Sequence, residues 1–215
     1  MSPLSRQTAF LVRQATLCGI VLTIAVPAWA DSPRVVSVEE HWELRLGEPD
    51  PDRSAPQTTM VHSPDGDLDD VHFLFTINHS TVPEYEPGGL QVQLWDNDQL
   101  VDSSSVGGGT LSFNEEVVTW VQRLSIENET LKFQVRDGES ETWGQFGGDD
   151  LTLTTATSLY SLNGYRPGVS ISESQVSYAE NRVGSLTLTK LVWITDDGEV
   201  HELNAPIAVD TSLDQ

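Results

Sequence analysis

Alternation of apolar and polar residues, interrupted at short intervals by turn residues, constrains the fold of this chain most. In the segment 131–136, Leu131, Phe133 and Val135 are each followed by a charged or amide side chain. Successive side chains of a strand point to opposite faces, so this pattern predicts one buried face and one solvated face. The pattern recurs at 41–46, 71–77, 90–95, 117–126, 151–157 and 186–195. Segments of this kind, rich in β-branched and aromatic residues and without helical stripes, predict an all-β protein.

Short connections between these segments favour antiparallel pairing. Turn residues occur at 96–98, 127–129, 137–138 and 196–198, where Asp, Asn and Gly accept the backbone angles of tight turns. The segments 117–126 and 131–136, joined at Asn128, predict one hairpin. A parallel sheet would need a helix of about a dozen residues after each strand, and the chain has no room for one. We therefore expect a single antiparallel β-sandwich, specifically a jelly roll.

The first 30 residues have the pattern of a signal peptide. Arg6 and Arg13 precede an apolar stretch at 17–28, which is too short to span a membrane and ends in Ala28-Trp29-Ala30. We expect cleavage after Ala30, a mature domain of residues 31–215 with a frayed tail at 210–215, and a secreted or periplasmic bacterial protein. Lipidation of Cys18 is disfavoured because Leu17, not a small residue, precedes it. The remaining sequence has no second hydrophobic span, which predicts no membrane span after cleavage.

The charge balance narrows the classes of partner. The chain has 33 acidic and 11 basic residues and a formal net charge of −22. Because phosphate backbones and anionic lipids are bound through clustered Lys and Arg, nucleic acid and membrane surfaces are disfavoured as partners.

A cluster of aspartates at 65–70 is a candidate metal site. Asp65, Asp67 and Asp69 alternate with other residues in this segment, and calcium selects six to eight oxygen ligands of this kind. The spacing departs from a helix-loop-helix calcium loop, because its sixth position is Asp70 instead of Gly. The alternative is a solvated turn ahead of the strand at 71–77.

A glycine-rich segment with two aromatic residues is a candidate ligand site. Trp143, Gln145 and Phe146 lie close together, and an exposed Trp can stack on a sugar ring while amides and carboxylates bind its hydroxyls. Trp95 and Asp96 could supply a second platform at the end of a strand. The alternative for these aromatic residues is packing in the core or at a sheet end.

Motifs of catalytic residues are not found in the sequence. It has neither a GxSxG nucleophile motif nor an HExxH zinc motif. Glu40 and Glu43 would point to opposite faces of a strand, so they cannot act as a pair on one sugar. We therefore assign no catalytic residue, and whether the protein is an enzyme stays open.

The mature chain resembles uncharacterised secreted β-sandwich proteins of environmental bacteria, through the segments 89–95, 142–147, 162–165 and 179–183. The hairpin from Trp120 to Asp137 also resembles the corresponding pair in concanavalin-type lectin and glucanase jelly rolls, over fewer than 20 residues. The closely spaced acids of the hydrolytic members are missing here.

Three functions follow as hypotheses. The first is non-catalytic binding of an extracellular polysaccharide, assisted by calcium. The second is a structural or protein-interaction component of the cell envelope, which a large exposed apolar patch would favour. The third is a polysaccharide-active enzyme, which requires two carboxyl groups about 5 to 9 Å apart in one groove.

Overall fold

The computed structural model describes residues 33–48, 56–78, 89–111, 113, 115–177, 179–204 and 206–209. The predicted signal peptide, the frayed tail and most of the predicted loop at 47–56 lie outside these residues. The described residues form thirteen strands: β1 (Val35–Leu46), β2 (Gln57–His62), β3 (His72–Ile77), β4 (Leu90–Asp96), β5 (Gln99–Val106), β6 (Val117–Glu127), β7 (Thr130–Ser140), β8 (Gly144–Phe146), β9 (Thr152–Ala156), β10 (Gln175–Ser177), β11 (Val183–Thr195), β12 (Val200–Leu203) and β13 (Ile207–Val209).

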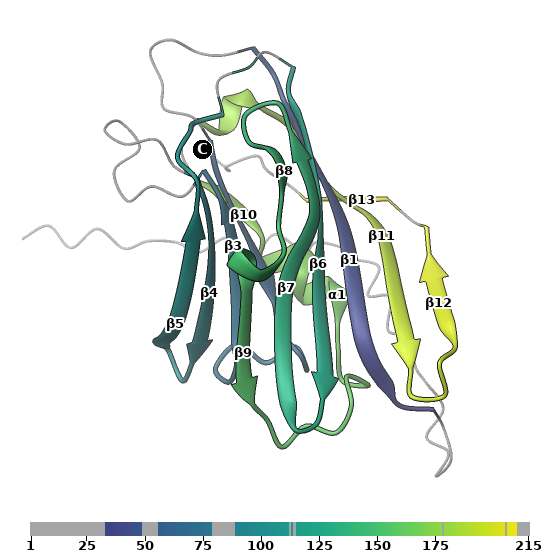
Figure 1. The fold of residues 1–215 in the computed structure, drawn as a ribbon. Coiled ribbons are helices and arrows are strands. Elements are labelled where there is room, and N and C mark those ends of the chain that lie inside the picture. The colour runs from purple at the N-terminus through teal and green to yellow at the C-terminus, as the bar shows by residue number, and fades with distance from the viewer. Residues whose placement is uncertain are drawn as a thin grey trace, which may run out of the picture.

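The strands form two antiparallel sheets, which confirms the prediction of an all-β protein (Figure 1). The eight-stranded sheet has the order β12-β11-β1-β6-β7-β8, with β13 pairing with β11 and β9 pairing with β7. The five-stranded sheet has the order β10-β2-β3-β4-β5. The sheets pack face to face as in a β-sandwich.

Tight turns fix the register of two hairpins. Asn128 and Glu129, between β6 and β7, both have positive φ, at 50° and 59°. Asn97 and Asp98 have φ of 49° and 58° between β4 and β5. Two successive residues of positive φ make the turn that matches the twist of hairpin strands, and Asn and Asp adopt it more readily than most residues. The predicted hairpin through Asn128 is confirmed.

Aromatic side chains from both sheets fill the core. Phe73 of the small sheet stacks on Phe133 of the large one at a centroid distance of 5.0 Å. Trp42 and Trp120, on neighbouring strands, lie parallel at 6.3 Å and 5°. The predicted inward residues of β7 are buried, with Leu131, Phe133 and Val135 each 0% exposed. The two-residue period of the sequence therefore determines which side chains enter the core.

The described residues include one α-helix, which the sequence analysis did not predict. A short helix, α1 (Pro167–Glu173), begins with a proline, whose fixed φ suits the first turn of a helix. It has seven residues, too few for the apolar stripe that would mark it in the sequence.

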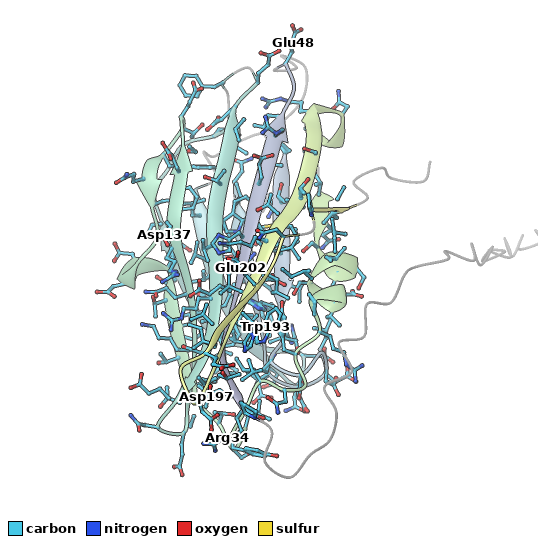
Figure 2. All side chains as sticks on the ribbon, turned by 90° about the vertical axis from the view of Figure 1, so that its right-hand side faces the viewer. Arg34, Glu48, Asp137, Trp193, Asp197 and Glu202 are labelled. Atoms are coloured by element: carbon cyan, nitrogen blue, oxygen red, sulfur yellow. The ribbon has the colours of Figure 1, made fainter. Side chains whose placement is uncertain are left out.

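At the edge of the large sheet, Trp193 stacks on His201 at 5.3 Å, and Figure 2 shows this region from the side. No helix in the described part of the chain is long and apolar enough to cross a bilayer.

Candidate functional site

The predicted aromatic segment around Trp143 is largely used in packing. The Trp143 ring meets Phe146 edge to face at 6.3 Å, and both rings are half-buried against the core. Phe146 in turn lies over Gly138, where an added Cβ would come within 2.3 Å of the ring. Gln145 is exposed. The contact between Trp143 and Phe146 therefore favours the alternative in which both rings pack against the core. Of the three predicted residues in this segment, only Gln145 is exposed enough to contact a ligand.

The structure separates the five predicted ligand-binding residues. Trp143 lies beside Gly109, whose backbone carbonyl accepts a hydrogen bond from Gly89 at the start of β4. Trp95 and Asp96 lie at the other end of that strand. The rise of a strand is about 3.3 Å per residue, so roughly 20 Å separate the two groups along β4. Trp95 and Asp96 therefore cannot share one sugar with Trp143, and they could act only as the separate second platform that the sequence analysis describes.

The aspartates of the predicted metal site act as acceptors within a turn. Asp65 Oδ1 accepts hydrogen bonds from the Asp67 N–H at 3.0 Å and from the Ser63 hydroxyl at 3.2 Å. Asp67 Oδ1 accepts from the Asp69 N–H at 3.0 Å. Among the residues that the structure describes, no group of three or more His, Cys, Asp or Glu side chains is placed to hold a metal ion. The geometry favours the turn alternative over a calcium site.

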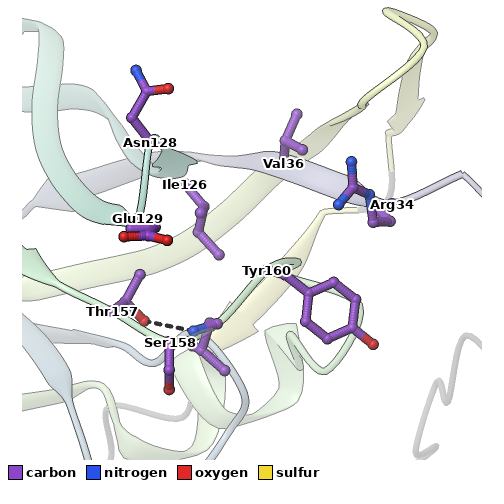
Figure 3. Close-up of a pocket in the computed structure, with 9 residues that line it drawn as sticks. Arg34, Val36, Ile126, Asn128, Glu129, Thr157, Ser158 and Tyr160 are labelled. Atoms are coloured by element: carbon purple, nitrogen blue, oxygen red, sulfur yellow. Dashed lines mark hydrogen bonds between the residues drawn. The ribbon is translucent and has the colours of Figure 1, made fainter.

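A surface hollow of about 490 Å³ opens at the end of the sandwich where β1 begins and β6 meets β7 (Figure 3). Its lining combines apolar side chains with guanidinium, hydroxyl, amide and carboxylate groups, and polar groups predominate. The lining is formed by Arg34, Val36, Ile126, Asn128, Glu129, Thr157, Ser158, Leu159 and Tyr160. Polar groups that converge on one hollow can orient a small ligand through hydrogen bonds.

Tyr160 is the most exposed large hydrophobic side chain of this hollow. It is 73% exposed and lies on the Arg34 side, opposite Asn128 and Glu129 (Figure 3). The sequence analysis did not select it, because the segment after β9 continues the Thr- and Leu-rich pattern of that strand. An aromatic residue ahead of the Asn163-Gly164 turn was the available signal.

Arg34 is held in place by Asp196. The Arg34 Nε–H donates to Asp196 Oδ2 at 2.7 Å, and the Arg34 backbone N–H donates to Oδ1 at 2.9 Å. These hydrogen bonds hold the pKa of the Asp196 carboxyl below its usual value. The hydrogen bond from Nε orients the Arg34 guanidinium beside the hollow.

A second group of titratable side chains lies between the sheets. Glu40 is 0% exposed and accepts hydrogen bonds from the Tyr165 hydroxyl and from Trp42 Nε1, the latter at 3.0 Å. Burial, together with the Glu40 charge, raises the pKa of Tyr165 well above its ordinary value. His62, also 0% exposed, meets the edge of Tyr165 at 5.3 Å, and burial lowers its pKa. Because Glu40 and His62 are buried between the sheets, we assign these side chains to the core and not to a ligand site.

Comparisons with protein-family models, characterised proteins and solved structures give no match for this chain.

Proposed function

We propose that this protein is a non-catalytic, exported binding protein for extracellular carbohydrate, and that the hollow beside Tyr160 is its site. The exposed ring of Tyr160, which lines a hollow rich in hydrogen-bonding groups, carries this proposal. An aromatic face stacks on the C–H face of a sugar ring, and the Tyr hydroxyl stays in water. Asn128, Thr157 and Ser158 supply donors and acceptors for sugar hydroxyls around the same hollow.

The hollow has a single carboxylate, which favours binding of a saccharide over its hydrolysis. Glu129 is the one acidic residue in its lining. Glycoside hydrolysis by acid and base, or by acid and nucleophile, needs two carboxyl groups flanking the scissile bond. A site with a single carboxylate and an aromatic platform is suited to hold a saccharide without cleaving it.

The proposal also includes export of the protein and a jelly-roll connection of its strands. The basic and then apolar leader with its Ala28-Trp29-Ala30 end supports secretion or a periplasmic location. Strand β1 lies between β11 and β6, so the chain returns at its end to the sheet in which it started. Long returns of this kind are typical of jelly rolls and other Greek-key sandwiches.

The test is binding of the purified protein to a panel of neutral polysaccharides, measured by affinity electrophoresis and calorimetry. Tyr160→Ala should weaken binding at least about tenfold, because the stacking platform is lost. Tyr160→Phe keeps the ring and should bind within about threefold of the parent. Trp143→Phe serves as the control outside the hollow. Equal binding by the parent and Tyr160→Ala, or no binding to any neutral glycan, would refute the proposal.

A second candidate is an envelope component that meets another protein. Leu100 and Val101 are consecutive, 48% and 58% exposed, and lie on β5 at the edge of the five-stranded sheet. Edge strands with exposed apolar residues invite pairing with another chain. Photo-crosslinking from position 101 in cells of the source organism tests this candidate, and a specific crosslinked protein is the expected result.

A further inference from the structure

The positive charge of this acidic chain is concentrated on one surface. Five of the 11 Lys and Arg residues lie on the outer face of the eight-stranded sheet. Their positions follow from the registers, which place them in line with the solvent-facing side chains of β1, and they are Arg45, Arg123, Lys132, Arg136 and Lys190. The same registers place Glu39, Glu43 and Glu202 on this face, so the basic residues lie among carboxylates there.

Four of these residues form a band across neighbouring strands. Lys132 and Arg136 lie on β7, Arg123 on β6 and Lys190 on β11. We call these four residues the basic band. Adjacent strands are about 4.8 Å apart, so the band extends roughly 14 Å from β7 to β11. Two exposed acids border it, Asp137 and Glu202, and both are labelled in Figure 2.

The centre of the band already holds a carboxylate. Glu39 Oε2 accepts a hydrogen bond from an Arg136 terminal nitrogen at 2.8 Å, and its Oε1 lies 3.7 Å from Arg123 Nε. The Glu39 side chain is 9% exposed, whereas the Arg123 and Arg136 side chains are 34% and 33% exposed. One buried carboxylate therefore neutralises part of two guanidinium groups, whose outer edges still face solvent.

Carboxylates also contact the outer cations of the band. Asp137 Oδ2 lies 3.3 Å from Arg136 Nε, and Glu202 Oε2 lies 3.7 Å from Lys190 Nζ. His41 is the register partner of Lys190, and burial together with the Lys190 charge lowers the pKa of its imidazole.

We infer that the basic band is a binding surface for a carboxylated polysaccharide. Guanidinium groups recognise carboxylates through paired N–H donors, and the band repeats cations over a distance that one small anion cannot cover. A chain that carries a carboxylate on each sugar unit can engage Arg123, Arg136 and a flanking lysine together. The basic band shares no residue with the lining of the Tyr160 hollow, so this inference does not depend on the function proposed for that hollow.

The probe is polygalacturonate, with its fully methyl-esterified form as the matched control. The ester keeps the sugar backbone and removes the charge. The parent protein should bind the acid form, should bind it more weakly as salt is raised, and should bind the ester at least about tenfold more weakly. Equal affinity for both polymers, or binding to neither, would overturn the inference.

Single-charge variants test the location. Lys132→Gln and Lys190→Gln leave in place the two arginines that pair with Glu39, so the buried carboxylate stays paired. Each substitution should weaken polygalacturonate binding about fivefold. Arg166→Gln removes the same charge from an exposed residue outside the sheet and should change binding less than about twofold. An equal loss in all three variants would show general electrostatics and overturn the site.

Two further outcomes separate the alternatives. Light scattering of the parent at low and high salt reports whether the band instead meets the acidic surface of a second copy. A salt-sensitive dimer that Lys190→Gln disrupts, without polygalacturonate binding, would overturn the inference in favour of self-association. Tyr160→Ala should retain polygalacturonate binding, so failure of the proposal for the hollow and failure of this one give different patterns.

Discussion

Glu39 and Glu40 are consecutive residues of β1 whose carboxylates are held in different ways. Glu39 faces outward and is paired with Arg136 and, at longer range, Arg123. Glu40 faces the core, is 0% exposed, and is held by the neutral donors of Tyr165 and Trp42. The core thus accommodates this acid with neutral hydrogen-bond donors, whereas Arg123 and Arg136 meet Glu39 on the solvent-facing side.

The inward and outward faces of β1 therefore have different roles, one in stability and the other at the surface. Interactions around Glu40 are enclosed, so changing them should alter the free energy of unfolding and leave ligand binding intact. Interactions around Glu39 are partly open to water, where ion pairs contribute less to stability and remain available to a partner. The following variants test this division, in order of expected effect.

The largest effect should come from the inward face of β7. Phe133→Ala removes a ring that is 0% exposed and stacked on Phe73, and it should lower the free energy of unfolding by about 3 to 5 kcal/mol. Gln134→Ala, on the outward face of the same strand, should cost less than about 0.5 kcal/mol. Urea denaturation measures both. Equal losses would contradict the division between the faces.

A smaller effect is expected from the donors of Glu40. Tyr165→Phe removes the hydroxyl that donates to this buried carboxylate and should cost about 1.5 to 3 kcal/mol, because the acceptor is charged. Tyr160→Phe, at the exposed hollow, should be within about 0.5 kcal/mol of the parent. Thermal and urea unfolding of the pair measure the difference. A neutral Tyr165→Phe variant would show that the enclosed acid does not need this donor.

The outer carboxylate should be less sensitive to loss of one partner. Arg136→Met removes the 2.8 Å hydrogen bond to Glu39 but leaves Arg123 nearby, so we expect a loss of about 1 to 2 kcal/mol. Arg45→Met breaks a more exposed pair with Glu43 and should cost less than about 0.5 kcal/mol. If Arg136→Met costs more than Tyr165→Phe, the outer pair is a structural element instead of an open surface.

The pH dependence of stability should come from His62. Its pKa in the folded protein is lowered by burial, so the unfolded chain binds more protons as the pH falls below about 6.5. The free energy of unfolding should therefore decrease as the pH is lowered from about 8 to about 5. His62→Phe should reduce this slope, while His41, whose pKa is shifted in the same direction, maintains part of it. An unchanged slope in His62→Phe would refute the assignment.

Strands with clear alternation were predictable from the sequence, and others were not. The inward and outward residues of β6 and β7 follow directly from their two-residue period and from the turn at Asn128. Strand β5 was missed because its serines and consecutive apolar residues do not alternate, and every side chain of 99–103 is exposed. β8 has three residues and is too short to show a period. Helix α1 is likewise too short to show a helical stripe.

The candidate sites were less predictable because they depend on which side chains meet in space. Composition marked Trp143 as a platform, but only the packed structure shows its ring against Phe146. Nothing in the local sequence relates Arg34 to Tyr160, since the two are brought together by the closure of the sandwich. The basic band is similar: its four residues come from three strands, and their alignment depends on registers that the sequence does not state.

The parallel pair of Trp42 and Trp120 has an optical consequence. Two indoles at 6.3 Å and 5° couple their electronic transitions, which gives a circular dichroism signal that depends on their mutual orientation. The signal reports the pairing of β1 with β6, the two strands that carry Glu39, Glu40 and Arg123. The Tyr160 hollow and the basic band contain no tryptophan, so saccharide titrations should leave it unchanged. Folding and binding can therefore be followed independently in the same cuvette.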